Sequence, residues 1–186
     1  MNVLSALKAI FKKKLACSTE TVYLKDALGR TLSKPIVTSK SIPEFDTSSM
    51  DGFAVKKSSL GKIKKFKILG DMPAGAKTDF AIKPSECVRV YTGSRMPKNA
   101  DFVVIQENTE TKQSFMLVKD FDKKNPYVRK AGLDFRKGQI ISHQKLIDYR
   151  LISTLASLNL EKLSVLKKPK VCIIPTGNEI LPLGSK

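Results

Sequence analysis

Apolar residues recur at helical spacing near both ends of the chain. One set lies at the start of the chain. The other runs from Ile147 through Leu151 and Leu155 to Leu158. Asn159 follows it, and asparagine tolerates the left-handed conformation that ends many helices. The spacing therefore predicts two amphipathic helices, and the apolar positions of the first are Val3, Leu4, Leu7, Ile10, Phe11 and Leu15.

The middle of the chain has a different pattern. From Phe53 to about Arg136, short segments rich in β-branched and aromatic residues alternate with Gly, Pro, Asn and Asp. This pattern predicts a small all-β unit, either a barrel or a sandwich. The segments are FAVKK, KIKKFKILG, ECVRVYTG, DFVVIQENTE and SFMLVKD, and EKLSVL predicts one more strand after the second helix.

The order of these patterns predicts an α+β fold with discontinuous domains. We expect a β-rich lobe at residues 41–137, inserted into a mixed α/β domain made of residues 1–40 and 138–168. The run Val171–Ile174 is continuously apolar, as in strands that are buried on both faces of a parallel sheet. One strand and one turn cannot form such a sheet. We therefore expect residues 169–186 to be the truncated start of an α/β domain.

Composition narrows the class of protein. The chain has 186 residues, of which 41% are hydrophobic and 27% charged, as in globular proteins. No apolar run reaches the roughly 18 residues of a membrane-spanning helix, and the basic residues near the N-terminus follow the apolar stretch, unlike those of a secretory signal. The cysteines Cys17, Cys87 and Cys172 are far apart, which argues against disulfides or zinc. We expect a cytoplasmic protein.

A net charge of +17 raises the question of nucleic-acid binding. Most of the positive charge is lysine, whereas arginine is the better reader of phosphates and bases. The lysines are spread in short clusters, as on a solvated surface, and no RNA-binding motif interleaves them with aromatic residues. A nucleic-acid partner is therefore disfavoured, although a basic, non-enzymatic binding module for a protein or nucleic-acid partner stays the alternative to an enzyme.

The stretch EFDTSSMDGFAV combines groups that could serve a metal or an anion. Gly52 permits a tight backbone turn, at which Asp51 could reach a metal ion. Magnesium often takes only one or two protein ligands. The hydroxyls of Ser48 and Ser49 could donate to an oxyanion, while Asp46 has no assigned role. The alternative is an Asp-Gly turn that opens a hairpin.

Three further positions carry candidate chemistry. Thr92 precedes Gly93 after a predicted strand, so a hydroxyl and exposed backbone N–H groups could bind an oxyanion there. The alternative is a threonine in a turn that ends a strand. In VRKAGLD, Arg129 and Asp134 either bind substrate or form an interdomain salt bridge. Glu179 follows the last predicted strand, where α/β domains usually bind ligands.

Four segments occur in an order and spacing that resemble the molybdopterin molybdenumtransferase family: IPEFDTSSMDGFAV, CVRVYTGSRMPKNADFVVIQE, AGLDFRKGQ and PKVCIIPTGNEIL. The resemblance covers only the N-terminal part of such a protein. It implies a transferase of molybdenum cofactor biosynthesis, which inserts molybdate into adenylylated molybdopterin and releases AMP with the help of magnesium. It also implies a homodimer, in which the β lobe of one subunit faces the molybdopterin-binding domain of the other.

The resemblance also implies roles for single residues. Asp51 and Glu179 become the candidates for a metal, whose full ligand set stays unknown. Two departures each remove a carboxylate: Leu133 and Asn178 stand where the family usually has acidic residues. The implied catalytic residues are Asp51, Thr92 and Asp134, and the implied substrate-binding residues are Ser48, Ser49, Arg129 and Glu179. Because most of the molybdopterin-binding domain would follow Lys186, we expect this chain alone to be inactive.

Overall fold

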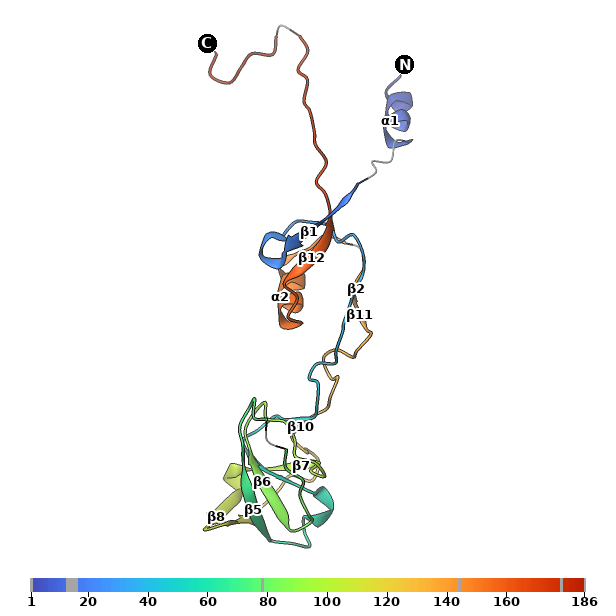
Figure 1. Cartoon of the computed structure of the whole chain (residues 1–186). Helices are drawn as coiled ribbons and strands as arrows, with labels where there is room; N and C mark the ends of the chain where they lie inside the picture. The colour runs from blue at the N-terminus through green and yellow to red at the C-terminus, as the bar shows by residue number, and fades with distance from the viewer. Residues whose placement is uncertain (1, 13–16, 78, 144, 178, 186) are drawn as a thin grey trace. The chain divides into compact units, whose positions relative to one another are not determined.

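The computed structural model describes residues 2–12, 17–77, 79–143, 145–177 and 179–185. The chain divides into two compact units (Figure 1). The first unit combines Met1–Ile36 with Ile141–Lys186, and the second unit is Val37–Ile140. Across the described ranges, every helix is too short or too polar to cross a membrane.

The first unit contains both α-helices and one pair of strands. Strand β1 (Thr19–Tyr23) pairs antiparallel with β12 (Lys162–Leu166). Helix α2 (Tyr149–Ser157) precedes β12, helix α1 (Val3–Lys12) precedes β1, and the 3-10 turn η1 (Leu24–Asp26) follows β1. The two predicted helices and the strand in EKLSVL are confirmed, except that Leu15 lies outside the described residues.

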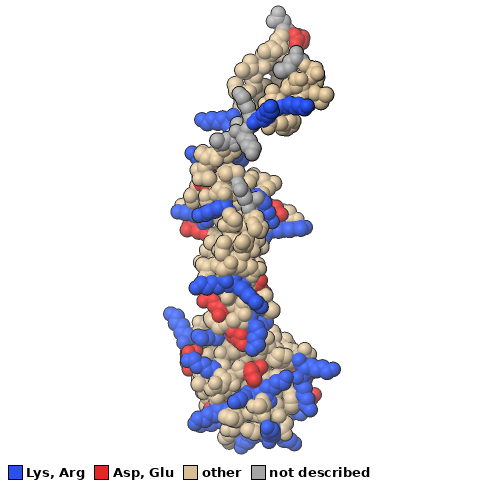
Figure 2. Space-filling model, turned by 90° about the vertical axis from the view of Figure 1, so that its right-hand side faces the viewer, with Lys and Arg blue, Asp and Glu red and all other residues tan. Residues whose placement is uncertain are grey.

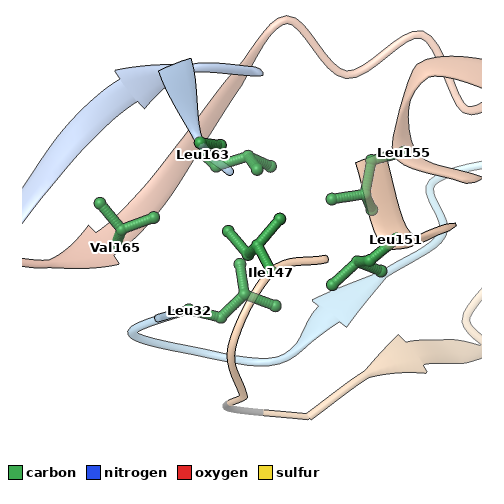
Figure 3. Packing of buried hydrophobic residues seen from close by; sticks show 7 residues of the cluster. Leu32, Ile147, Leu151, Leu155, Leu163 and Val165 are labelled. Atoms are coloured by element: carbon green, nitrogen blue, oxygen red, sulfur yellow. The ribbon is translucent and has the colours of Figure 1, made fainter. Parts of the chain in front are cut away.

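Helix α2 forms the centre of the first unit's core. Its Leu151 and Leu155 point toward Ile147 and belong to the same buried cluster as Leu163 of β12 (Figure 3). The side chain of Asp148 caps the helix by accepting a hydrogen bond from the backbone N–H of Leu151 at 2.8 Å. Asn159 has a φ of 57°, the left-handed conformation expected after the helix. The other buried members of this core are Ala27, Leu32, Ile147 and Val165.

The apolar face of α1 is exposed. None of the residues of α1 is buried, and Phe11 keeps 80% of its accessible surface. The amphipathic pattern therefore predicted the helix correctly, whereas the described residues provide no neighbour that covers its apolar side. Tertiary contacts, rather than the pattern itself, decide whether such a face is buried.

The segment after β12 is extended and exposed. Residues 167–177 and 179–185 contain no helix or strand, and Ile173 keeps 86% of its accessible surface. The prediction of a strand at Val171–Ile174 is therefore wrong for this chain. A strand requires a neighbour for its backbone N–H and C=O groups, and the described residues supply none for Val171–Ile174.

A six-stranded sheet forms the second unit. Its order is β7-β4-β6-β5-β9-β8, in which β5 and β6 are parallel and the other pairs are antiparallel. The predicted all-β unit is confirmed. It is an open sheet with β7 and β8 at its edges, and it is neither a closed barrel nor a sandwich. The strands are β4 (Gly52–Val55), β5 (Lys65–Met72), β6 (Glu86–Val90), β7 (Phe102–Ile105), β8 (Thr109–Lys112) and β9 (Phe115–Val118).

Both faces of this sheet are covered. Phe53 and Val55 of β4 belong to one buried cluster together with Phe66 of β5, whereas Ala54 belongs to a second cluster with Val88 of β6. Alternate residues of a strand point to opposite faces. The interior strand β4 is therefore buried along its whole length, which holds the start of this strand in a fixed position.

Short elements complete the second unit and join it to the first. Strand β3 (Thr47–Ser48) pairs antiparallel with β10 (Val128–Arg129). This pair connects the segment before β4 to the C-terminal part of the second unit, which is called the lobe from here on. Strand β2 (Ile36–Val37) pairs with β11 (Ile140–Ser142) where the chain passes between the units. The 3-10 turns η2 (Lys57–Ser59) and η3 (Gln106–Asn108) follow β4 and β7.

Candidate functional site

Asp51 and Thr92 meet at one end of the sheet. Asp51 directly precedes β4 and Thr92 follows β6, and the two strands pair with Gly52 opposite Val90. The backbone N–H of Thr92 donates to Oδ1 of Asp51 at 2.8 Å, and its hydroxyl donates to the same oxygen at 3.0 Å. Oδ2 of Asp51 accepts no hydrogen bond from the described residues. One carboxylate oxygen is thus fixed and the other is available to a ligand.

These contacts also fix the charge of Asp51. The two hydrogen bonds from Thr92, the backbone bond first, hold the pKa of Asp51 below its ordinary value. The positive charge of Arg89 acts in the same direction. Asp51 is therefore ionised at neutral pH, with its free oxygen at the surface of the lobe.

Gly52 has a different role from the predicted one. It lies in β4 rather than in a turn, and its φ is not positive, so the Asp-Gly hairpin turn and the tight turn at Gly52 are both wrong. A Cβ atom at this position would lie 2.1 Å from the backbone oxygen of Val104. The glycine is needed because β7 passes too close for any side chain, and it thereby sets the position of Asp51.

The turn after β6 uses its N–H groups internally. The N–H of Gly93 donates to the carbonyl of Ser48 at 2.9 Å, and that of Ser94 donates to the carbonyl of Tyr91 at 2.8 Å. The N–H of Thr92 is bound to Asp51. The prediction that exposed N–H groups of this turn bind an oxyanion is therefore wrong, because they hold the loop and Asp51 in place.

Ser48 ends β3, and Ser49 begins the short loop between β3 and β4. Ser48 is buried, and its hydroxyl donates to the carbonyl of Met50 at 2.5 Å. The backbone N–H of Ser49 donates to the carbonyl of Tyr127 at 2.9 Å. Ser48 therefore shapes the loop that carries Asp51, and a substrate-binding role for either serine stays a prediction.

A second polar cluster follows β10. Nη2 of Arg129 donates to both carboxylate oxygens of Asp134, at 2.9 and 2.8 Å. The structure thus brings together the two residues that the sequence singled out in this segment. Both side chains are exposed, and Leu133 between them is 61% exposed. An exposed ion pair of this kind contributes little stability, and it presents a charged pair at the surface of the lobe.

Asp46, which had no assigned role, joins the two ends of the lobe. Its carboxylate accepts hydrogen bonds from Nζ of Lys130 at 2.7 Å and from the backbone N–H of Ala131 at 2.9 Å. Partial burial acts to raise the pKa of Asp46, but these hydrogen bonds outweigh it and lower the pKa below its ordinary value. Asp46 is thus engaged on both oxygens, whereas Asp51 is engaged on one.

Glu179 belongs to the first unit and is exposed in the segment after β12. Asn178, the departure noted beside it, lies outside the described residues. The described residues form no group of three acidic, histidine or cysteine side chains that could hold a metal. What they do offer is the single free oxygen of Asp51, a hard ligand of the type that magnesium accepts when a substrate supplies the remaining oxygens.

The positive charge is spread rather than concentrated on the face shown in Figure 2, where Asp and Glu side chains lie among the Lys and Arg side chains. Arg89 is the functional candidate that the sequence reasoning missed. It lies near the end of the interior strand β6, within the run CVRVY. The signal was present, since a charged residue between the apolar Val88 and Val90 calls for a reason.

Comparison with known proteins identifies the family. The family described as the MoeA N-terminal region (domain I and II) matches residues 1–159. A molybdopterin molybdenumtransferase of Staphylococcus epidermidis is 30% identical over 188 residues, which cover 97% of this chain and 45% of that protein. Its counterpart in Staphylococcus aureus is 32% identical over 190 residues, covering 98% and 45%.

A crystal structure of the molybdopterin biosynthesis moeA protein of Pyrococcus horikoshii has a TM-score of 0.88 and 28% sequence identity, and the match covers all of this chain and 49% of that one. The chain thus spans less than half the length of the curated relatives that it matches. The resemblance found in the sequence motifs is confirmed over the N-terminal part of these proteins. The chain belongs to the MoeA N-terminal region family.

Proposed function

We propose that this chain is the N-terminal part of a molybdopterin molybdenumtransferase. In this proposal, the whole protein inserts molybdate into adenylylated molybdopterin with release of AMP. The names of the relatives support the reaction. The observation in this chain that carries the proposal is the Asp51–Thr92 pair, in which an ionised carboxylate is fixed through one oxygen and presents the other.

The proposed reaction needs no protein nucleophile. Molybdate insertion exchanges oxo ligands for the sulfurs of the dithiolene, so the protein must hold two anions and orient them. The buried thiol of the lobe, Cys87, has its pKa raised to about 12 by burial and stays protonated. The hydroxyl of Thr92 donates its hydrogen bond to Asp51, so in this proposal Thr92 positions the carboxylate rather than attacking a substrate.

We include magnesium in the proposal, with Asp51 as one ligand through its free Oδ2. Magnesium would neutralise part of the negative charge on the two substrates when it is bound. One carboxylate suits this ion, because magnesium keeps waters and substrate oxygens as its other ligands. Glu179 is the second candidate. The proposal keeps the roles that the family resemblance implies: substrate binding for Arg129, Ser48 and Ser49, and a catalytic role for Asp134.

The domain assignment belongs to the same proposal. Residues 41–137 are the inserted lobe, residues 1–40 and 138–168 are the mixed α/β domain, and residues 169–186 are the start of the molybdopterin-binding domain. In the proposed homodimer, the site is completed by that domain of the other subunit. The exposed apolar side chains of Val171, Ile173 and Ile174 support a segment that takes its place in a larger sheet.

Complementation tests the proposed function. The complete gene that encodes this chain is expressed in a bacterium whose own molybdopterin molybdenumtransferase gene has been deleted, and molybdoenzyme activity is measured. We expect activity to be restored by the wild-type gene and to be lost with Asp51→Asn. The matched control is Asp46→Asn, which removes a carboxylate from the same loop and should retain most of the activity.

A second arm uses the 186-residue chain alone, which we expect not to restore activity. Failure of the complete gene to restore activity, although its product accumulates in folded form, would contradict the proposed function. Restoration by the 186-residue chain alone would contradict the proposal that further sequence completes the site.

A further inference from the structure

Arg89 occupies a position where a charged side chain needs a partner. In the central strand β6 it lies opposite Phe53 of β4 on one side and Asp71 of β5 on the other. Its guanidinium carbon lies 5.9 Å from the centre of the buried Phe53 ring and 5.6 Å from that of Tyr91. The aromatic faces stabilise the cation. The charge of the guanidinium also acts on Asp51, which lies at the same end of the sheet.

The hydrogen-bond donors of this guanidinium are unused. Arginine carries five N–H donors in one plane and is always charged. Among the described residues, no carboxylate, carbonyl or hydroxyl accepts a hydrogen bond from the Arg89 side chain, and no acidic group forms a salt bridge with it. Arg30, Arg95 and Arg129, by contrast, each have a carboxylate partner.

The two carboxylates closest in the strand register accept hydrogen bonds from other groups, and in the described residues neither accepts one from Arg89. Asp71, directly across from Arg89, accepts a hydrogen bond from the hydroxyl of Tyr91 at 3.2 Å. Asp51 accepts both of its hydrogen bonds from Thr92. The backbone N–H groups of the adjacent turn are also consumed. Among the described residues at this end of the sheet, the Arg89 side chain is therefore a hydrogen-bond donor without an acceptor.

We propose that Arg89 is an anion-binding residue, whose planar guanidinium holds a phosphate-class oxyanion beside the Asp51–Thr92 pair. A guanidinium matches two oxygens of such an anion at once, which is why arginine is favoured for recognising phosphate groups. Binding by Arg89 stands on the geometry of this chain. That the anion is molybdate, or the phosphate of the adenylylated substrate, rests on the proposed function.

Asp51 sets a condition on this binding. A bare oxyanion beside an ionised carboxylate is repelled, whereas a divalent cation on the free oxygen of Asp51 would link the carboxylate to the anion. The arrangement of Arg89 on one side and Asp51 on the other thus predicts that magnesium strengthens anion binding. It also explains why a carboxylate and an unpaired guanidinium share one end of the sheet.

Nuclear magnetic resonance on the 186-residue chain tests the proposal without any turnover assay. The chain is titrated with inorganic phosphate, molybdate or AMP, with and without Mg²⁺, at constant ionic strength so that general screening does not change. We expect the Nε–H signal of Arg89 and the amide signals of Tyr91 and Thr92 to shift together with one dissociation constant. A tighter response to molybdate or to AMP identifies which oxyanion the site prefers.

Two variants with the same loss of charge separate a specific site from general attraction. Arg89→Gln should weaken the binding by about 10-fold or more, as expected for a lost charge-assisted hydrogen-bond pair. Arg95→Gln, whose arginine is paired with Asp79, should stay within about twofold of wild type. If Arg89→Gln does not fold, the Arg89 Nε–H signal of the wild-type chain decides, and it must shift with the same constant as Thr92.

The proposal is overturned if no anion produces a saturable shift, if Arg89→Gln binds like wild type, or if both variants weaken binding equally. The outcomes are separate from those of complementation. If complementation fails while phosphate binds at Arg89, the proposed function falls and the anion site stands. If complementation succeeds while the Arg89 signal does not move, the anion site falls and the proposed function stands.

Discussion

The two units differ in how their apolar side chains are used. The second unit buries both faces of its six-stranded sheet, so that Phe66 and Met116 on one face and Met72 on the other are inaccessible to water. The first unit has one small core around α2, while Phe11 of α1 and Ile173 after β12 stay exposed. Similar residues are thus core in one unit and surface in the other.

The comparison shows that a periodic apolar pattern specifies an element but not its burial. The lobe provides its own partners for every strand of its sheet, and it also carries the Asp51–Thr92 and Arg129–Asp134 pairs. A rigid sheet is a suitable support for functional side chains, because its strands cannot shift without breaking two packed faces. The experiments below test this difference between the units.

Gly52→Ala is expected to have the largest effect. The added Cβ would lie 2.1 Å from the backbone oxygen of Val104 and 2.9 Å from Cα of Ile105, so β4 and β7 would have to separate. We expect the free energy of unfolding of the lobe to fall by about 4 kcal/mol or more. Urea denaturation measures it, and Gly61→Ala is the control.

Gly61 has a φ of +80°, and a Cβ atom added to it would have no other atom within 4 Å. Its substitution should therefore cost only about 1 kcal/mol of backbone strain. Equal losses for the two alanine variants would show that the close approach of β7 is not what requires glycine at position 52.

Leu155→Ala tests the small core of the first unit. The side chain is fully buried, so its truncation leaves a cavity and should lower the unfolding free energy by about 3 kcal/mol. Leu4→Ala makes the same chemical change in α1, where the side chain is 69% exposed. It should change stability by less than about 0.5 kcal/mol. A large loss from Leu4→Ala would mean that α1 is packed in solution.

Asp51→Asn should separate function from stability within the lobe. The amide can still accept the two hydrogen bonds from Thr92, so the melting temperature should stay close to that of wild type. Loss of the charge should lower molybdenum insertion by the complete protein by about 10²-fold, or roughly 2.7 kcal/mol in the activation free energy. Turnover close to wild type, or a large fall in melting temperature, would show that the role of Asp51 is structural.

Acid should weaken the lobe more than the first unit. Hydrogen bonds and nearby positive charges lower the pKa of five carboxylates within residues 37–140: Asp46, Asp51, Asp79, Glu110 and Asp122. A carboxylate with a lowered pKa in the folded state stabilises the fold above its unfolded pKa, 3.8 for aspartate. That contribution is lost as the pH falls through the lowered value.

Amide hydrogen exchange between pH 5 and pH 3 would report each unit separately. Protection in β4 and β6 should fall more steeply than protection in α2. Asp46→Asn should reduce this difference slightly, by less than about 1 kcal/mol at neutral pH, because the side chain of Asp46 is 36% exposed and its ion pair is screened. Parallel loss in both units would remove the electrostatic distinction between them.

Local patterns predicted the elements of the fold better than their assembly. The helix that ends before Asn159 and the strand Lys162–Leu166 follow from periodicity and from one cap residue. The openness of the large sheet and the parallel pairing of β5 with β6 do not follow, because no local pattern encodes which strands become neighbours. The strand expected at Val171–Ile174 was wrong because an apolar run needs a partner.

The candidate site was predictable as a set of residues but not as a set of contacts. Asp51 and Thr92 were identified from motifs, whereas their two hydrogen bonds depend on β4 lying beside β6. The reason for Gly52 could not be read locally, because Val104 is distant in sequence. Arg89 carried a readable signal, a charge between two apolar residues of a strand. Its meaning appears only once the hydrogen bonds of Asp71 and Asp51 are seen to come from Tyr91 and Thr92.

The pairing of β2 with β11 has a consequence for how such a protein could have arisen. The chain enters the unit 37–140 next to the place where it leaves it, through two strands that are hydrogen-bonded to each other. A segment whose ends are neighbours can be gained, lost or exchanged as one continuous stretch of gene, since only two junctions must be rejoined. The lobe could thus have evolved as a single heritable unit, with its carboxylate and guanidinium carried along together.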